Sequence, residues 1–217
     1  MSLPSDTPED ILDLGCGTGL LSKEFAMRGH HVVGVDPASA MLDVARRAPQ
    51  PPNIEWVEAR SETYESDRKF DLIIMTGHAF QVLLSDQQIS QTLRTMADHL
   101  KPDGRIVFET RNPALDWDAI WSREYTMETD QGRVRAVRRI TDATRTPEYL
   151  SFAWDYHFPD VTLTSDSTLR FPSASDITSF AKAMDLEISD IFGDWNGSGF
   201  DPVVSREMIF ILEFKSK

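Results

Sequence analysis

A glycine-rich turn between a short apolar run and an amphipathic stretch is the strongest constraint on the fold of this chain. Residues 11–14 predict a buried strand, the turn runs to Gly19, and residues 18–28 place apolar side chains at helical spacing. Glycines let the backbone approach a ligand without a Cβ clash, and the free N–H groups of the following helix attract negative charge. Such turns also occur for close packing alone, so a ligand site needs support from a second residue.

Asp36 supplies that support at the end of the next predicted strand, residues 31–35. A carboxylate there can accept hydrogen bonds from both ribose hydroxyls of a nucleoside, and it can also cap the following helix. The glycine spacing argues against a dinucleotide, because a G-x-G-x-x-G fingerprint that begins at Gly15 needs glycine at position 20, which is Leu20. The pattern therefore favours a nucleoside cofactor without a pyrophosphate.

The first half of the chain alternates short apolar runs with amphipathic stretches. Further strands are predicted at 54–57, 70–76 and 105–110, with helices over 39–48 and after Ser85, which begins a Ser-x-x-Gln capping box. Residues 101–104 form a predicted turn before the last of these strands. Strands that alternate with helices at this spacing predict an α/β fold with a parallel sheet covered on both faces.

From residue 111 the pattern changes. Residues 111–122 are irregular and aromatic, and four further strands are predicted, joined by connections too short for crossovers: 123–128, 133–141, 149–157 and 161–170. A helix capped by Ser173 and strands at 186–192 and 204–214 complete the chain. We therefore predict a single domain over 1–217, in which 111–170 is an inserted antiparallel β cap that roofs the substrate pocket.

Charge and cysteine content narrow the function further. The net charge of −13 disfavours nucleic acid as a partner, and no apolar run is long enough to cross a membrane. A single cysteine, Cys16, permits no internal disulfide and favours the cytoplasm. We expect a small-molecule substrate, a monomer or homodimer, and no metal.

Four motifs in order resemble the class I S-adenosylmethionine (SAM)-dependent methyltransferases of the small-molecule, Rossmann-like type. They are residues 11–19, residues 33–37 with Met41 and Leu42, residues 70–74 and residues 100–104. The resemblance spans residues 11 to about 110. It implies a seven-stranded, mostly parallel sheet whose last strand, 204–214, is antiparallel. It also implies an enzyme that transfers the methyl group of SAM to an O, N or C atom of a small acceptor and releases S-adenosylhomocysteine.

The resemblance also implies positions for the cofactor. Asp13 and Gly15 would lie near the methionine end, Asp36 would hold the ribose and Met41 would pack near the adenine. The loop after the third strand reads Glu58-Ala59-Arg60-Ser61 and lacks the aspartate that this family often places by the adenine, so Arg60 or Ser61 would contact the base instead. The full cofactor set is Asp13, Gly15, Cys16, Gly17, Asp36, Pro37, Met41, Arg60, Ser61, Thr76 and Gly77.

The remaining candidates concern the acceptor. His78 follows the fourth strand and is a candidate general base, because imidazole titrates near neutrality; it could equally line the pocket. Arg111, Trp117, Trp121 and His157 are candidate substrate residues, each with an ordinary packing role as the alternative. The arginines at 133, 135, 138, 139 and 145 are expected on a solvated face. Cys16 is expected to be an inert filler of the turn.

Two other readings remain at this point. The chain could be a non-catalytic SAM-binding regulatory subunit, or a NAD(P)-dependent oxidoreductase. Little sequence precedes the first predicted strand, which predicts a more open cofactor site, a truncated chain, or protection of the site by a partner.

Overall fold

The structure is a computed structural model that describes residues 3–47, 49–129, 132–142 and 148–215. Residue 48, the predicted end of one helix, and Arg145 lie outside these ranges. The strands are β1 (Asp10–Leu14), β2 (His31–Asp36), β3 (Ile54–Glu58), β4 (Phe70–Met75), β5 (Leu100–Arg111), β6 (Glu124–Thr129), β7 (Gly132–Ile140), β8 (Tyr149–His157), β9 (Thr162–Arg170), β10 (Leu186–Phe192) and β11 (Glu207–Phe214). The helices are α1 (Leu20–Met27), α2 (Ser39–Arg47), the 3₁₀ turn η1 (Ala79–Val82), α3 (Asp86–His99), α4 (Trp117–Ile120) and α5 (Ala174–Lys182).

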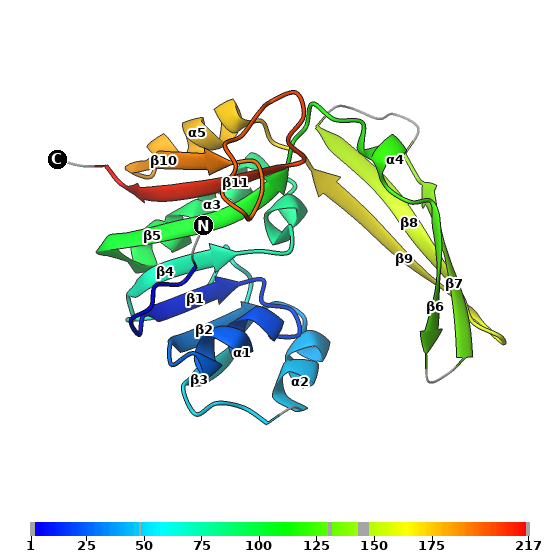
Figure 1. The fold of residues 1–217 in the computed structure, drawn as a ribbon, viewed down its shortest axis with the longest axis horizontal. Helices are drawn as coiled ribbons and strands as arrows, with labels where there is room; N and C mark the ends of the chain where they lie inside the picture. Colours follow the sequence, from blue (N-terminus) through cyan, green and yellow to red (C-terminus); the bar gives the residue numbers. More distant parts are fainter. Residues whose placement is uncertain (1–2, 48, 130–131, 143–147, 216–217) are drawn as a thin grey trace.

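The strands form a large sheet of seven strands and a small sheet of four (Figure 1). The large sheet has the order β10-β11-β5-β4-β1-β2-β3, and only β11 runs against its neighbours. These features confirm the predicted fold class. Strands β1 to β3 are added in one direction and β4 and β5 in the other, so the order reverses between β1 and β4. Open α/β sheets bind ligands at the carboxyl ends of strands at such a switch point, which places the predicted turn and the segment after β4 at the site.

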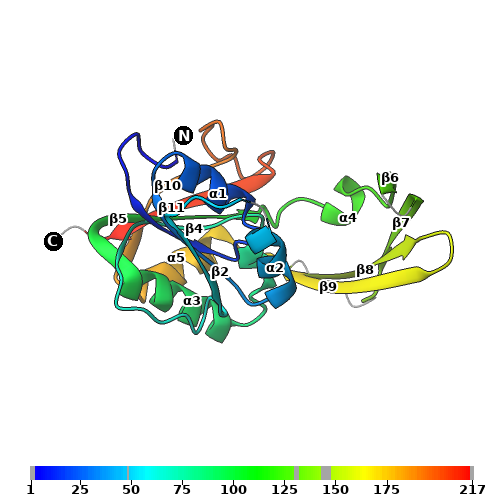
Figure 2. The ribbon, with the colours of Figure 1, turned by 90° about the horizontal axis from the view of Figure 1, so that it is seen from below.

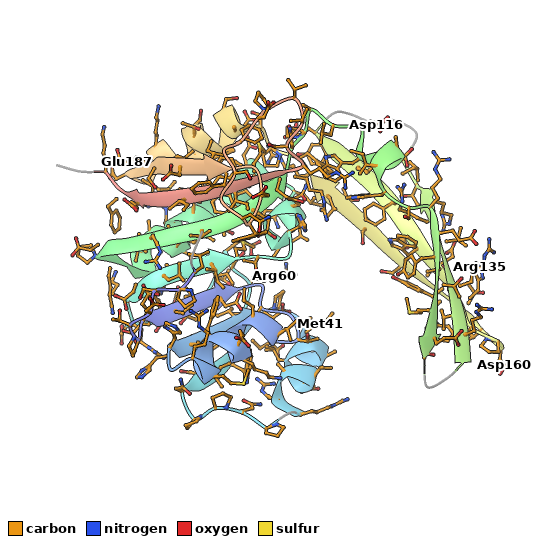
Figure 3. The ribbon with its side chains drawn as sticks, viewed as in Figure 1. Met41, Arg60, Asp116, Arg135, Asp160 and Glu187 are labelled. Atoms are coloured by element: carbon orange, nitrogen blue, oxygen red, sulfur yellow. The ribbon has the colours of Figure 1, made fainter. Side chains whose placement is uncertain are left out.

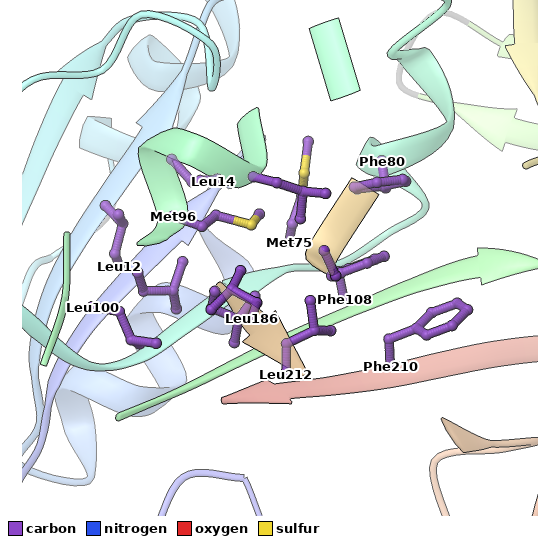
Figure 4. Close-up of a cluster of buried hydrophobic side chains, with 14 of the residues drawn as sticks. Leu12, Leu14, Met75, Phe80, Met96, Leu100, Phe108, Leu186, Phe210 and Leu212 are labelled. Atoms are coloured by element: carbon purple, nitrogen blue, oxygen red, sulfur yellow. The ribbon is translucent and has the colours of Figure 1, made fainter. Parts of the chain in front are cut away.

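Two apolar clusters hold the helices against the large sheet. The larger cluster lies between the sheet and helices α3 and α5, and it includes a stack of Phe80, Phe108 and Phe210 with ring centroids 4.2 and 5.3 Å apart (Figure 4). The second lies on the opposite face, under Phe25 and Ala26 of α1. Figure 2 shows α1 on one side of the sheet and α3 and α5 on the other. This burial on both faces explains why the central strands read as nearly continuous apolar runs.

Strand β5 is longer than predicted. It begins at Leu100, and its pairing with β4 jumps from Leu100 opposite Phe70 to Arg105 opposite Leu72. Residues 101–104 therefore bulge out of the ladder as an insertion inside the strand. The turn-forming residues interrupt the pairing with β4, but the strand continues on both sides of them. Helix α4, in the segment expected to be irregular, is a single turn that Asp116 caps by accepting from the Ala119 amide.

The small sheet is an antiparallel meander, as the four predicted strands require. Its base is tied to the large sheet near η1 and α3. The Arg170 guanidinium donates to Asp86 and Glu148 at 2.6 Å each, and the Tyr149 hydroxyl donates to the Leu84 carbonyl at 2.8 Å. Figures 1 and 2 show the sheet extending outward from this attachment. Within the described ranges, no helix is both long enough and apolar enough to cross a bilayer.

Candidate active site

The glycine turn is held by the strand beside it. The amides of Gly15 and Cys16 both donate to the Val35 carbonyl at the end of β2, at 2.8 and 3.0 Å. Gly15, Gly17 and Gly19 have φ angles of 76°, 56° and 73°, a left-handed conformation that costs other residues energy. The sequence therefore needs glycine at these positions to form the turn at all.

We expect alanine at Gly15 to be more destabilising than alanine at Gly17, although both positions carry the same φ penalty. A Cβ on Gly15 would lie 2.7 Å from the Ala79 Cβ, whereas a Cβ on Gly17 meets no heavy atom within 4 Å. Overpacking adds about 1–3 kcal/mol to the roughly 1 kcal/mol of backbone strain. Urea unfolding of Gly15→Ala and Gly17→Ala without ligand measures the difference. Equal losses would show that Ala79 moves aside.

Asp36 links the turn to helix α2. Its Oδ2 accepts from the Gly17 amide at 2.9 Å and its Oδ1 accepts from the Ala38 amide at 2.8 Å. The residue is 8% exposed, so the surrounding backbone fixes the carboxylate in place. A carboxylate has about four acceptor positions, which leaves two for a ligand.

Asp36 also lines a pocket of about 250 Å³ that we call the nucleoside pocket. Its walls are Gly15, Asp36, Pro37, Arg60, Ser61, Glu62, Met75, Ala79, Val82, Leu83 and Gln88. The structure thus brings together five of the predicted cofactor residues from three separate segments. Figure 3 shows Arg60, after β3, on the side of the large sheet from which the small sheet extends.

Glu62 is a pocket residue that the sequence reasoning missed. The prediction stopped at Ser61 and treated the acidic side chain of this loop as absent, yet a carboxylate lines the pocket one residue later. It accepts from the Ser61 hydroxyl at 3.2 Å and from the Gln88 side-chain amide at 3.1 Å. The capping-box glutamine of α3 therefore also orients a pocket carboxylate, which only the packing of α3 against this loop reveals.

Three other predicted residues lie around the turn without lining the nucleoside pocket. Met41, on α2, is 46% exposed. The Cys16 sulfur packs near Gly34, and burial together with the charges of Asp13 and Asp36 raises the pKa of the thiol far above its usual range. A thiol that stays protonated is a poor nucleophile, in keeping with a filler. Asp13 is buried and accepts a hydrogen bond from the Ser22 hydroxyl on α1.

Burial raises the pKa of Asp13 to about 6, the Ser22 hydrogen bond lowers it in part, and the charges of Asp36 and Glu109 raise it further. Because the folded-state pKa exceeds the unfolded value, this group contributes stability below about pH 4, and the contribution is lost as the pH rises through about 6. Asp13→Asn should therefore stabilise the ligand-free protein at pH 7.5 relative to pH 4, by about 2 kcal/mol. Urea unfolding at both pH values checks this, with exposed Asp43→Asn as the control. A constant difference between variant and wild type would contradict it.

A second, larger pocket lies on the α1 face, at the ends of β4 and β5. It has a volume of about 450 Å³ and we call it the apolar pocket. Its walls are Leu3, Leu21, Phe25, Ile74, Thr76, Gly77, Glu109 and Trp195. Predicted residues Thr76 and Gly77 therefore border this pocket, which is separate from the nucleoside pocket, and Glu109 is its one carboxylate.

His78 follows β4 and lies in a polar cluster with Arg111, at the end of β5, and Glu207, at the start of β11. Its φ of 62° is left-handed, which is uncommon outside glycine. The imidazole Nε2 lies 2.9 Å from a Glu207 carboxylate oxygen and Nδ1 lies 3.1 Å from the Arg111 Nη2. Arginine can only donate, so Nδ1 accepts and Nε2–H donates to Glu207. The geometry therefore selects one neutral tautomer.

Arg111 joins this cluster to the aromatic segment. Its Nη1 donates to the Gln81 side-chain oxygen at 2.8 Å, and its guanidinium carbon lies 4.8 and 5.5 Å from the ring centroids of Trp121 and Trp117. Burial lowers the pKa of Arg111, while the negative charges of Glu207 and Glu109 act to raise it. Three of the four predicted substrate residues thus contact one another beside His78.

His157 is not among them. It pairs with Arg135 at the far end of β8, eight residues from Tyr149 at the base, which is about 26 Å along a strand. Figure 3 shows Arg135 at this distant end. On β7 the arginines at positions 133, 135 and 139 are exposed to solvent, as expected. Arg138 was expected on the same solvated face, but it is buried and donates to the Asp118 carboxylate at 2.9 Å.

The residues present fit SAM, the cofactor implied by the motifs. Asp36 keeps two acceptor positions that suit the ribose hydroxyls, and open space lies beside Gly17. The negative charge of Asp36 acts on Asp13 across the turn, so a cation bound there relieves this repulsion. SAM carries positive sulfonium and ammonium groups, whereas a pyrophosphate would add negative charge to an acidic site.

Comparison with known proteins agrees with these features. A family model described as a methyltransferase domain matches residues 11–104. The cypemycin N-terminal methyltransferase of a Streptomyces species is 26% identical over 94% of this chain and 82% of its own length. A ubiquinone biosynthesis O-methyltransferase from Stutzerimonas stutzeri is 31% identical, but over only 54% of this chain and 52% of its own length.

Among solved structures, a S-adenosylmethionine-dependent methyltransferase from Clostridium acetobutylicum superimposes with a TM-score of 0.78. The alignment covers 95% of this chain and 84% of that one at 17% identity. The likeness therefore extends over both sheets and concerns the fold.

Proposed function

We propose that this class I SAM-dependent methyltransferase transfers the methyl group of SAM to the amine nitrogen of a small organic acceptor. The observation that carries the amine is the acidic character of the site. Asp13, Asp36, Glu109 and Glu207 gather around the carboxyl ends of the strands, where Arg111 and the nucleoside-pocket residue Arg60 are the neighbouring cations. Such a field favours ligands that arrive as cations, which amines do at neutral pH.

The residues of the nucleoside pocket would hold the cofactor, with Asp36 on the ribose and Pro37, Arg60, Ser61 and Glu62 around the base. When bound, SAM supplies a methyl group on a sulfonium, which is an activated donor. Fixing the two reactants in line can provide most of the acceleration. The chain's own main contribution is therefore to position the acceptor and to deal with its proton.

His78 is the proposed receiver of that proton. An ammonium must lose a proton before its nitrogen can attack, and the His78 Nδ1 lone pair is the acceptor in the tautomer that the cluster selects. Glu207 then faces the Nε2–H and stabilises the imidazolium. Because Arg111 occupies Nδ1 in this structure, the proposal requires the guanidinium to turn away when the acceptor binds. An acceptor carboxylate or the faces of Trp117 and Trp121 would receive it.

The similarity to the cypemycin N-terminal methyltransferase supports an amine acceptor, because it covers the small sheet as well as the cofactor half. A hydroxyl acceptor is the second candidate, since O-methyltransferases of ubiquinone biosynthesis are also similar to this chain. Those matches span about half of the chain, so they support the shared cofactor half more than a shared acceptor. The expectations of a cytoplasmic location, a monomer or homodimer, and no nucleic acid or metal stay predictions.

The test is release of S-adenosylhomocysteine by the purified chain with SAM and matched pairs of acceptors that differ only in an amine or a hydroxyl. We expect turnover with amines and little with the corresponding alcohols and phenols. Turnover confined to hydroxyl acceptors would replace the amine by oxygen. Tight SAM binding without turnover on any acceptor would favour a non-catalytic SAM-binding role.

A further inference from the structure

The apolar pocket contains a buried carboxylate among mostly apolar walls. Leu21 and Phe25 of α1, Ile74 of β4 and Trp195 from the β10–β11 connection form an apolar enclosure. At the ends of the strands this enclosure meets Glu109, which is only 3% exposed. Burying a carboxylate among apolar side chains costs free energy unless a partner offsets it, so the partners of Glu109 decide what the pocket can bind.

Only one of the two Glu109 oxygens has a partner in the described part of the chain. Oε1 accepts from the His78 amide at 2.9 Å, and Oε2 is buried without a hydrogen bond. Burial raises the pKa of Glu109, the backbone amides of His78 and Gly77 lower it, and the Glu207 charge adds to the increase. Arg111 interacts with Glu109 through its charge, but its hydrogen bonds go to Gln81 and His78.

The position of Glu109 is fixed by the large sheet. Glu109 pairs with Ile209 across β5 and β11, and the His78 amide donates a hydrogen bond to its Oε1. The side chain therefore cannot turn toward solvent without breaking that bond. A buried acceptor that is held rigidly and left unpaired is suited to a ligand that brings its own donor.

We propose that Glu109 receives the ammonium group of the acceptor, whose apolar body occupies the apolar pocket between α1 and Trp195. This inference rests on the proposed methylation of an amine, and it names the acceptor class as amphipathic primary or secondary amines. The ammonium donates to Oε2, and its nitrogen then lies beside the segment that carries His78. The walls of Leu21, Phe25 and Ile74 select against acceptors that are polar throughout.

A primary ammonium is also present in SAM itself, so the experiment must separate the two sources. Calorimetry would first measure SAM and S-adenosylhomocysteine binding to the wild type and to Glu109→Gln. It would then titrate 2-phenylethylamine, and 2-phenylethanol as its neutral counterpart, into each protein saturated with S-adenosylhomocysteine. Glu187→Gln is the matched control, because Glu187 is exposed near the start of β10, at the end of the large sheet away from the small sheet (Figure 3).

We expect Glu109→Gln to weaken 2-phenylethylamine binding by about tenfold or more, to leave 2-phenylethanol unaffected and to keep SAM affinity within about threefold. Equal amine affinity in wild type and variant would overturn the proposal. A loss of SAM affinity without loss of amine affinity would assign Glu109 to the cofactor and also overturn it.

Two results do not depend on the folding of Glu109→Gln. The wild type must bind the amine more tightly than the alcohol, and Glu109→Asp, which keeps the charge on a shorter side chain, must bind it with intermediate affinity. Failure of the first result sinks the inference while the proposed methyl transfer stands. Failure of the wild type to bind SAM would instead remove the proposed function.

Discussion

Replacing Asp36 with alanine should weaken SAM binding by about 100-fold or more. The substitution removes the proposed acceptor for the ribose hydroxyls and also leaves the amides of Gly17 and Ala38 without their partner. Each hydrogen bond to a charged group contributes about 1.5–3 kcal/mol, and a tenfold change in affinity corresponds to about 1.4 kcal/mol. The loss of the ribose contacts alone therefore accounts for the expected change.

Calorimetric titration with SAM and S-adenosylhomocysteine measures this effect. Asp43→Ala is the matched control, since Asp43 is an exposed aspartate of the neighbouring helix α2 that pairs with Arg46. Circular dichroism at the same temperature shows whether Asp36→Ala remains folded. If the folded variant bound SAM as well as Asp43→Ala does, the assignment of the ribose to Asp36 would be wrong.

Replacing His78 with asparagine should lower kcat by about 100-fold at saturating SAM and amine, which is the size of a general base contribution. Asparagine tolerates the left-handed backbone that His78 adopts, with φ of 62°, so the change removes the imidazole and spares the turn. SAM affinity should stay within about threefold, because His78 does not line the nucleoside pocket.

A structural role for His78 predicts a different result. If the imidazole only holds Arg111 and Glu207 in place, the variant would show a raised KM for the amine with little change in kcat. The pH profile separates the two roles further, because loss of a base removes the acidic limb of kcat. His31→Asn is the control, since His31 is exposed at the start of β2, away from the carboxyl ends of the strands.

Most of the fold could be predicted from the order of strands, turns and caps. The parallel core, the capping box at Ser85, the helix cap at Ser173 and the antiparallel small sheet follow from local patterns, and all are present. The path of β5 through residues 101–104 could not be predicted. A proline followed by a glycine usually ends a strand. Here the pairing of β5 with β4 resumes after Pro102 and Gly104, because Leu100 and Ile106 on either side of them are both buried in the same core.

The candidate site likewise contains residues that could be predicted from the sequence and residues that could not. Gly15 and Asp36 were predicted from the glycine turn and the end of the next strand, whereas Pro37, Arg60 and Ser61 were implied by the resemblance to the methyltransferases. Parallel strands bring such positions to one edge of the sheet. Glu62 and Glu109 were missed because nothing in their neighbouring residues distinguishes them from surface acids. His157 was predicted from its residue type alone, and the length of β8 carries it away from the cluster around Arg111.

The sequence by itself determined the glycine turn, the position of Asp36 at the end of β2 and the class of cofactor, because these depend on backbone conformation and on short-range spacing. Only the tertiary structure decided which acids meet. Asp13, Asp36 and Glu109 lie on three different strands, and the repulsion that Asp36 and Glu109 exert on Asp13 exists only when β1, β2 and β5 are assembled in one sheet, with β4 between β5 and β1. The unpaired oxygen of Glu109 likewise arises from burial, and burial is a property of the assembled sheet and of no single segment.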